Sequence, residues 1–303
     1  MGRIDTHHHV VPPFYAARLR ADGALAGGLP IPDWDAVSAL AIMDRHDVDV
    51  AVLSVSTPGA PEALMARDVN DFAAQVVADH PGRFGFFATL PLPDVDAALE
   101  ELARSFDDLG ADGVVLLANH GGTYLGDKAF DPVFEELQRR GAVAFVHPSI
   151  LPGLEPIDGI PTFVADFLLD TTRAAVNMAR SGTLDRCPEV RIILAHAGGF
   201  MPYAAYRLSQ AAGDGDVLAG LARLQRFYFD IALSGTPSAL PSLLAFTTPD
   251  HVTFGTDFPY APDMAVAAMT SMYESYPLDD AARDSIDRGT AEALFPQFQE
   301  MTS

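Results

Sequence analysis

The sequence of 303 residues lacks the features that build disulfide-linked, membrane-spanning or secreted proteins. Its one cysteine, Cys187, has no partner in the chain with which to form a disulfide. No segment approaches the roughly 20 consecutive apolar residues of a membrane-spanning helix, and the N-terminus has no basic stretch followed by an apolar one. We therefore expect a cytoplasmic protein that does not associate with a membrane.

Basic residues are also scarce in this chain. It has 19 Lys and Arg residues against 41 Asp and Glu, for a formal net charge of −22, and Lys128 is its one lysine. Such a charge repels nucleic acids and anionic membrane surfaces, so neither is an expected partner. The acidic residues are spread along helix-like segments such as 94–108, which is typical of a solvated outer surface rather than of an acidic binding tail.

Hydrophobic residues make up 49% of the chain, enough to form a large core. Short β-branched runs alternate with amphipathic segments, the pattern of a parallel sheet covered by helices. Strands are predicted at 3–6, 48–55, 84–89, 113–117, 143–146, 191–195, 227–230 and 252–254. Helices predicted between them include 61–79, 94–109, 130–140 and 166–185. The expected fold is α/β, a (β/α)₈ TIM barrel formed by residues 1–303 as a single domain.

Two segments are longer than the minimal barrel repeat requires. Residues 12–33 are rich in proline and glycine, and residues 148–161 contain four prolines. Both follow predicted strands, and in a barrel the loops after strands form the face on which active sites are built. We interpret both segments as loop insertions that form walls or lids near the active-site mouth.

The strongest local motif is Asp5-Thr6-His7-His8-His9, at the end of the first predicted strand. Alternate side chains of an extended chain point to the same side, so His7 and His9 can bind one ion while His8 faces elsewhere. The motif is embedded between a strand and the sequence Val-Val-Pro-Pro, which distinguishes it from a purification tag. The spacing therefore predicts that His7 and His9 contribute to a metal site.

Three further residues occupy similar positions: His147 ends the fifth predicted strand, His196 follows the sixth and Asp257 follows the eighth. A barrel brings these strand ends to one mouth. Imidazole and carboxylate groups are ligands for zinc and its first-row neighbours. A two-metal site of this architecture usually has a bridging lysine at the end of the fourth strand, whereas this strand ends in Leu-Leu-Ala-Asn. We therefore expect one divalent ion, Zn²⁺, with Mn²⁺ as the alternative.

These motifs, taken together, resemble the amidohydrolase-related family over nearly the whole chain. They are His7-x-His9, His147, His196-Ala-Gly-Gly and Gly255-Thr-Asp257-Phe-Pro. Within that family the sequence is most similar to non-oxidative decarboxylases, which include the aminocarboxymuconate-semialdehyde and γ-resorcylate decarboxylases. Residues 3–15, Met43-Asp44 and 56–59 resemble those of 6-methylsalicylate decarboxylases in particular. The resemblance implies a TIM barrel of the metal-dependent hydrolase type and its metal, but it does not settle the substrate.

The resemblance also implies roles for individual residues. It implies that His196 is the acid–base residue and that the metal ligands are His7, His9, His147 and Asp257. Arg207 aligns with an arginine that, in the semialdehyde decarboxylase, reaches the active site of a neighbouring subunit and binds the substrate carboxylate. This implies a homodimer or a higher homo-oligomer.

The chain departs from its relatives at two positions. The γ-resorcylate decarboxylases have a glutamate where this chain has His7, which places it outside that branch. The semialdehyde decarboxylase has a second carboxylate-binding arginine shortly before its Met-Asp pair, where this chain has Ala39. The semialdehyde is therefore a disfavoured substrate.

The expected reaction is decarboxylation of a small ortho-hydroxylated aromatic acid. The metal would hold the carboxylate and the adjacent phenolate oxygen. His196 would protonate the ring, with Asp257 as a possible proton carrier. Asn119, after the fourth strand, is expected to contact the substrate. Hydrolysis of a lactone, ester or amide by the same mononuclear site stays open, because metal-bound water with His196 as base would use the same residues.

Overall fold

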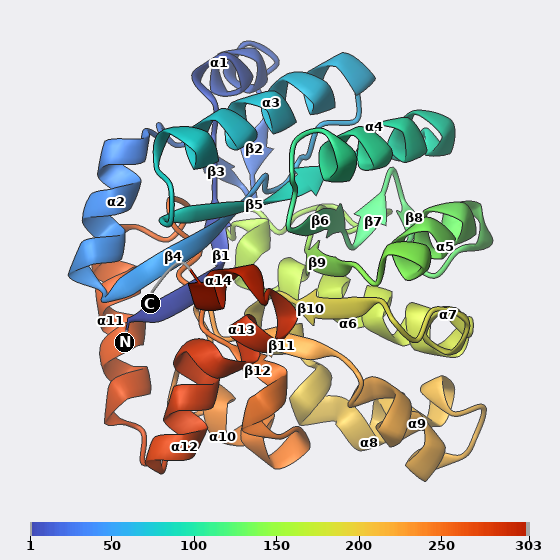
Figure 1. Ribbon diagram of the computed structural model, residues 1–303. Helices are drawn as coiled ribbons and strands as arrows, with labels where there is room; N and C mark the ends of the chain where they lie inside the picture. Colours follow the sequence, from blue (N-terminus) through green and yellow to red (C-terminus); the bar gives the residue numbers. More distant parts are fainter. Residues whose placement is uncertain (1, 301–303) are drawn as a thin grey trace.

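The computed structural model describes residues 2–300. Its main sheet has eight strands, each parallel to its neighbours, and helices surround it (Figure 1). In sheet order the strands are β1 (Arg3–His9), β4 (Val48–Ser54), β5 (Phe84–Thr89), β6 (Gly113–Leu117), β9 (Val143–His147), β10 (Arg191–Leu194), β11 (Tyr228–Asp230) and β12 (Val252–Thr253). All eight predicted strands are confirmed, with boundaries that differ from the predictions by a few residues at most.

The sheet closes into a barrel through its first and last strands. Asp5 and Phe254 form a parallel bridge, and the Thr6 amide donates a hydrogen bond of 3.0 Å to the Phe254 carbonyl. The Thr6 and Thr253 hydroxyls lie 2.8 Å apart across the same seam. The α/β TIM-barrel prediction is therefore confirmed, and closure brings β1 and β12, at opposite ends of the chain, into contact.

One helix of the outer ring follows each barrel strand. These helices are α2 (Ala36–Arg45), α3 (Ala63–Asp79), α4 (Val95–Asp107), α5 (Asp131–Arg140), α6 (Asp166–Arg180), α8 (Met201–Ala212), α10 (Ala239–Phe246) and α11 (Asp263–Ser275). Aspartates cap several of them: the side chains of Asp35 and Asp94 accept hydrogen bonds from backbone N–H groups in the first turns of α2 and α4. The predicted helix 166–185 is divided in two, because α6 ends at Arg180 and α7 (Thr183–Arg186) begins after Gly182, whose φ is +79°.

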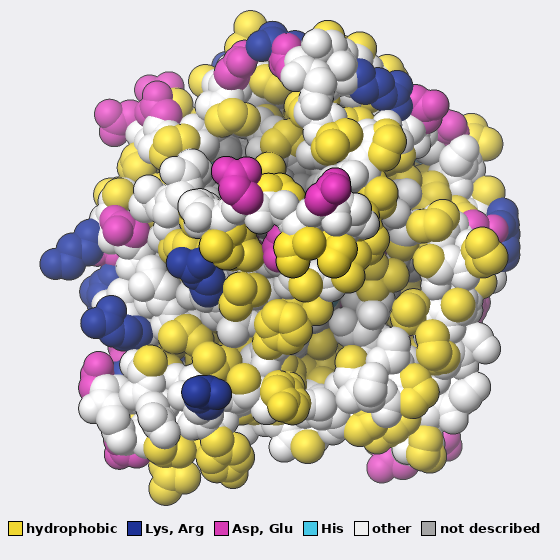
Figure 2. Space-filling model, turned by 180° about the vertical axis from the view of Figure 1, so that it is seen from behind, with side chains coloured by type: hydrophobic (Ala, Val, Ile, Leu, Met, Phe, Trp, Pro, Cys, Tyr) yellow, Lys and Arg dark blue, Asp and Glu magenta, His cyan; other side chains and the backbone are white. Residues whose placement is uncertain are grey.

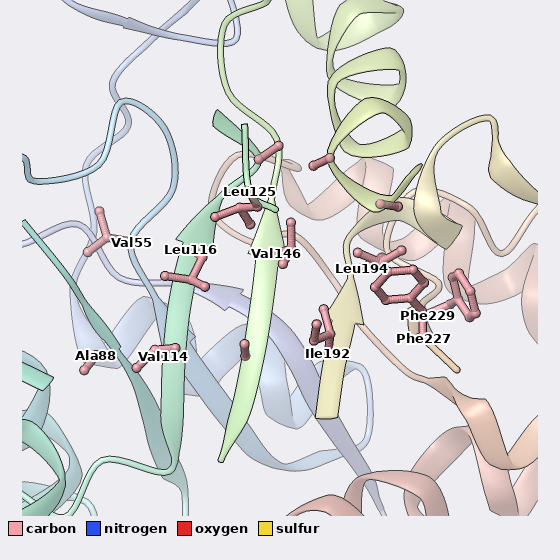
Figure 3. Close-up of a cluster of buried hydrophobic side chains, with 14 of the residues drawn as sticks. Val55, Ala88, Val114, Leu116, Leu125, Val146, Ile192, Leu194, Phe227 and Phe229 are labelled. Atoms are coloured by element: carbon pink, nitrogen blue, oxygen red, sulfur yellow. The ribbon is translucent and has the colours of Figure 1, made fainter. Parts of the chain in front are cut away.

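Alternation along the strands divides the core into two layers. Residues such as Val114, Leu116 and Val146 belong to the larger cluster, between the strands and the helices (Figure 3). Val115 and Phe145, one position away, belong to the second cluster, inside the barrel. The inner cluster is closed at one end by side chains from α13 (Thr290–Leu294) and α14 (Gln297–Glu300), which lie in front of the barrel in Figure 1.

Residues 12–33 form more than a loop. They contain α1 (Pro13–Ala21) and a hairpin of β2 (Leu25–Ala26) and β3 (Leu29–Pro30). Pro13 occupies the first position of α1, where its missing N–H costs no hydrogen bond, so proline here begins a helix rather than preventing one. Residues 148–161 contain no helix or strand. A second hairpin, β7 (Asn119–His120) and β8 (Thr123–Tyr124), follows β6 and was not predicted.

The remaining α-helices are α9 (Val217–Leu224), which packs on α8, and α12 (Asp280–Asp284) near the C-terminus. Across residues 2–300, no helix combines the length and the apolar character that crossing a membrane requires.

Candidate metal centre and active site

Strand β1 directs its histidines to two different sides. The Nε2 atoms of His7 and His9 lie 3.0 Å apart, whereas the Nδ1 atom of His8 lies 3.0 Å from the carboxylate of Asp5. All three imidazoles are fully buried. The predicted alternation is confirmed: His7 and His9 converge, and His8 belongs to a separate hydrogen-bond network that joins Asp5 to Thr256.

Three other strand ends supply the rest of the cluster. Oδ1 of Asp257, after β12, lies 3.0 Å from Nε2 of His9 and 3.3 Å from Nε2 of His7. The His147 ring centroid, at the end of β9, is 4.9 Å from that of His9. His196, after β10, joins His7, His147 and Asp257 in a set whose ligand atoms all lie within 4.8 Å of one another. The structure thus brings together all five residues that the sequence placed at this site.

The backbone reaches this cluster through a close approach and a strained turn. A Cβ on Gly255 would lie 2.8 Å from the Cβ of His7, so the Gly-Thr-Asp motif needs glycine here. Four of the six described non-glycine residues with positive φ line the cavity at the cluster: His196, Ala197, Leu233 and Asp257, with φ between 53° and 62°. Such conformations are typical of functional sites, where surrounding structure maintains them.

Each histidine of the cluster is oriented by an acceptor on the far side of its ring. The Nδ1 atoms lie 3.0 Å from Asp230 Oδ2 for His7, 3.3 Å from the Ser54 carbonyl for His9, 2.8 Å from the Pro148 carbonyl for His147 and 3.1 Å from the Ala232 carbonyl for His196. A proton on Nδ1 satisfies each of these acceptors and leaves a lone pair on Nε2. This is how metal-binding histidines are usually held.

The donor set fits a divalent cation. With Nδ1 protonated, His7 and His9 present lone pairs to each other at 3.0 Å, and both face the Asp257 carboxylate. Acceptors that face one another without water or a donor repel, and burial increases that repulsion. A positive ion among them converts the repulsion into attraction. Nitrogen and carboxylate donors of this kind suit zinc or manganese.

The charges around the cluster keep two of its imidazoles neutral and favour a bound positive charge. Burial and the neighbouring histidines lower the pKa of His147 well below its usual range, and burial lowers that of His9, so both imidazoles keep a free lone pair. Burial also disfavours a charged His7, but the carboxylates of Asp230 and Asp257 outweigh it and raise the pKa of His7 to about 10. The same carboxylates attract a metal cation at that position.

Asp257 remains ionised despite its burial. Burial acts to raise the pKa of its carboxyl, but positive charge at His7 outweighs burial and lowers that pKa well below its usual range, as a cation bound at the same place would. A carboxylate is therefore available as an anionic ligand.

The cluster lies at the wall of a cavity of about 830 Å³. His147, His196 and Asp257 line it together with apolar side chains from several loops and helices, among them Phe163, Phe167, Phe200, Leu233, Tyr260 and Met269. Ala26 and Leu29, from the hairpin within residues 12–33, also line it, whereas no described residue of 148–161 does. Among the described lining residues there is no Lys or Arg.

Asn119 and Arg207, the two predicted substrate contacts, lie outside the lining of this cavity. The Asn119 amide is buried and donates hydrogen bonds to the Asp170 carboxylate and the Ile150 carbonyl, while its oxygen accepts one from the Gly122 amide. In this structure Asn119 therefore anchors the 148–161 loop. Arg207 is exposed on α8, and its side chain has no hydrogen bond or ion pair with any described residue.

Sequence reasoning missed Asp230, which is fully buried at the end of β11. One carboxylate oxygen faces His7, and the other accepts hydrogen bonds from the His196 and Ala232 amides at 3.2 and 2.9 Å. It thereby connects two residues of the cluster. Asp230 ends a predicted strand, as His147 does, so the same positional criterion would have found it.

Comparisons with known proteins agree with this geometry. Residues 4–297 match the family model described as amidohydrolase. The chain is 38% identical over 330 residues to a decarboxylase of Aspergillus niger, covering 99% of this chain and 89% of the relative. It is 36% identical over 321 residues to a 6-methylsalicylic acid decarboxylase of Penicillium expansum, covering 99% and 98%. A crystal structure of an amidohydrolase II superimposes with a TM-score of 0.91 at 26% identity, covering 97% and 99%. The chain belongs to the amidohydrolase family.

Proposed function

We propose that this protein is a metal-dependent decarboxylase of a small ortho-hydroxylated aromatic acid, with 6-methylsalicylate the first substrate to test. The observation that carries the proposal is the position of His196, beside the other cluster residues and at the wall of a largely apolar cavity. A metal-holding protein without catalysis has no need of this fifth group. Relatives named as decarboxylases, one of them of 6-methylsalicylic acid, support the assignment.

The proposed metal ligands are His7, His9, His147 and Asp257, and the proposed ion is one Zn²⁺ per chain, with Mn²⁺ as the alternative. When bound, the ion would supply Lewis-acid chemistry that orients and neutralises the carboxylate and phenolate oxygens of the substrate. Elemental analysis of the purified protein is expected to find close to one ion per chain. Two ions per chain would contradict the mononuclear site.

The cavity wall suits a flat ring that carries one carboxylate. Phe163, Phe167 and Tyr260 offer aromatic surfaces to such a ring. Because no described lining residue is Lys or Arg, a second carboxylate on the substrate would be desolvated without a cationic partner from this chain's own cavity. This favours a monocarboxylic hydroxybenzoate over a dicarboxylic substrate.

His196 is the proposed proton donor. Its Nδ1 donates to the Ala232 carbonyl, which fixes the ring and directs Nε2 towards the cavity. In the imidazolium form, His196 transfers the Nε2 proton to the ring carbon that bears the carboxylate. The bond to the carboxylate then breaks, its electron pair returns to the ring, and carbon dioxide leaves. His196 regains a proton from water, so the net reaction consumes one proton and yields a phenol and carbon dioxide. Asp257 is the alternative proton carrier.

Product analysis tests the proposal. The metal-loaded protein is expected to release carbon dioxide from 6-methylsalicylate and, in deuterated buffer, to leave one deuterium at the carbon that lost the carboxylate. The other ring positions are not expected to exchange. If hydroxybenzoates are untouched while a lactone, ester or amide is cleaved with incorporation of solvent oxygen, the enzyme is instead a hydrolase that uses the same residues.

The proposed assembly is a homodimer, in which Arg207 completes the partner's site. Several large apolar side chains on α8 and next to it are exposed: Tyr203 is 89% exposed, Tyr206 72% and Leu218 76%. Figure 2, seen from the side opposite to that of Figure 1, shows hydrophobic side chains gathered across the centre of the molecule. Tyr203 also lines the cavity, so a subunit that covered this surface would lie at the cavity's entrance.

A further inference from the structure

The cavity extends beyond the metal cluster, into a groove between two helices. Helix α10 follows β11 and α11 follows β12, and these strands are neighbours in the barrel, so the two helices begin side by side at the end where Asp257 lies. We call this region the α10–α11 groove. Its lining residues are Leu233, Ser238, Ala239, Ser242, Ala261, Ala265 and Met269.

Small side chains keep the groove open. Ala239 and Ser242 are one turn apart on α10, while Ala265 lies in the first turn of α11 and Ala261 in the segment just before it. Larger residues at these positions would fill the space between the helices. Cavities of roughly 300–1,000 Å³ hold ligands of drug size, which are larger than a single substituted benzene ring. The observed cavity of about 830 Å³ lies near the upper end of that range, so it has room for more than the ring.

The chemistry of the groove is largely apolar and uncharged, with the hydroxyls of Ser238 and Ser242 as its polar groups. Leu233 and Met269 contribute its large side chains, Ala239 and Ala265 its small ones, and among its described lining residues none is charged. A ligand group that enters it therefore gains by leaving water in proportion to its hydrocarbon surface. The ionised end of such a ligand would remain at the proposed metal site, in the part of the cavity lined by His147, His196 and Asp257.

We infer that the α10–α11 groove binds an alkyl substituent of the aromatic ring, so that the preferred substrates are salicylates with a chain longer than methyl. This inference rests on the proposed function and specifies its substrate class.

Paired substrates test the inference. The value of kcat/KM for 6-pentylsalicylate is expected to exceed that for 6-methylsalicylate by about 10-fold or more, because single methylenes in an apolar pocket discriminate by roughly that factor. The dissociation constants of the two acids, measured by calorimetry on the metal-loaded protein, are expected to differ in the same direction. The binding measurement needs no turnover.

A matched pair of variants locates the effect. Ala265→Phe fills the groove from α11, and it is expected to lower the pentyl-to-methyl ratio of both constants at least about 10-fold. Ala267→Phe introduces the same side chain at an exposed position of the same helix that faces away from Ala265, and it is expected to leave the ratio as it is in the unaltered protein. Equal ratios in both variants would overturn the assignment of the groove.

The outcomes separate this inference from the proposed function. If 6-methylsalicylate releases carbon dioxide but the pentyl compound binds no more tightly and reacts no faster, the decarboxylase assignment stands and the inference is wrong. If neither acid releases carbon dioxide, the proposed function fails, and the calorimetric ratio alone decides whether the groove binds alkyl chains.

Discussion

The Nδ1 atom of His7 lies 3.0 Å from the Oδ2 atom of Asp230, and both side chains are fully buried. The two residues are 223 positions apart in the chain. Through this contact Asp230 selects the tautomer of His7 that can bind a metal and adds negative charge behind the imidazole. Oδ1 of the same carboxylate holds the His196 amide, so one aspartate positions both a proposed ligand and the proposed acid.

Asp230→Asn is expected to weaken metal binding by about 10–100-fold, because an amide keeps the hydrogen-bonding shape but not the charge behind His7. Metal affinity measured by competition with a chelator checks this. Asp250→Asn removes one exposed carboxylate elsewhere and serves as the control. Equal affinities in the two variants would show that Asp230 has a purely structural role.

His9→Ala is expected to empty the metal site, whereas His8→Ala is expected to retain the metal. His9 faces Asp257, but His8 faces Asp5 on the other side of β1. Metal content after dialysis is the measurement, with thermal unfolding of both variants to confirm that they fold. Comparable metal loss from both folded variants would contradict the assigned ligand register.

His196→Ala is expected to lower turnover by roughly 10²-fold or more while the metal remains bound, since a positioned proton donor contributes about that much. Turnover and metal content are measured on the same preparation, with His251→Ala as a control outside the cavity. Loss of the metal from His196→Ala would instead identify this residue as a ligand.

A mixture of Arg207→Ala and His196→Ala chains is expected to recover activity that neither variant has alone. If each site combines its own His196 with the partner's arginine, a mixed dimer contains one intact site. Activity is measured after subunit exchange, which differently tagged chains demonstrate by co-purification. Absence of recovery after proven exchange would show that Arg207 does not act across subunits.

The stability of the fold is expected to depend on Asp112 between about pH 4 and pH 6. Burial raises the pKa of its carboxyl to about 6, although Gln297 and the Phe86 amide donate hydrogen bonds to it. In this window Asp112 is ionised in the unfolded chain but protonated in the folded chain, so unfolding releases a proton. The contribution of Asp112 to the free energy of unfolding therefore decreases as pH rises. Above about pH 6 the contribution is constant.

Asp112→Asn is expected to remove that decrease. The measurement is the difference in free energy of unfolding between the unaltered protein and Asp112→Asn across this pH range, which cancels the contributions of other carboxylates. The variant is expected to gain relative stability as pH rises from 4 to 6. A difference that is flat with pH would mean that the Asp112 pKa is not raised.

Much of the barrel could be predicted from local sequence because its signals are local. The strands at 84–89 and 113–117 were predicted to the residue, since β-branched and aromatic runs between helical segments have few alternative structures. The convergence of His7 and His9 follows from the two-residue period of a strand. Parallel strands with their ends at one mouth then brought His147, His196 and Asp257 to the same place.

Tertiary structure decided the features that depend on distant residues. The helix α1 within residues 12–33 escaped prediction because proline and glycine counts do not reveal that Pro13 stands at a helix start. The role of Asn119 was decided by a distant residue. Its side-chain amide donates a hydrogen bond to Asp170, 51 positions away, and so helps to anchor the 148–161 loop instead of contacting the cavity. The Asp230–His7 contact and the α10–α11 groove likewise exist because barrel closure and helix packing set distances that no local pattern encodes.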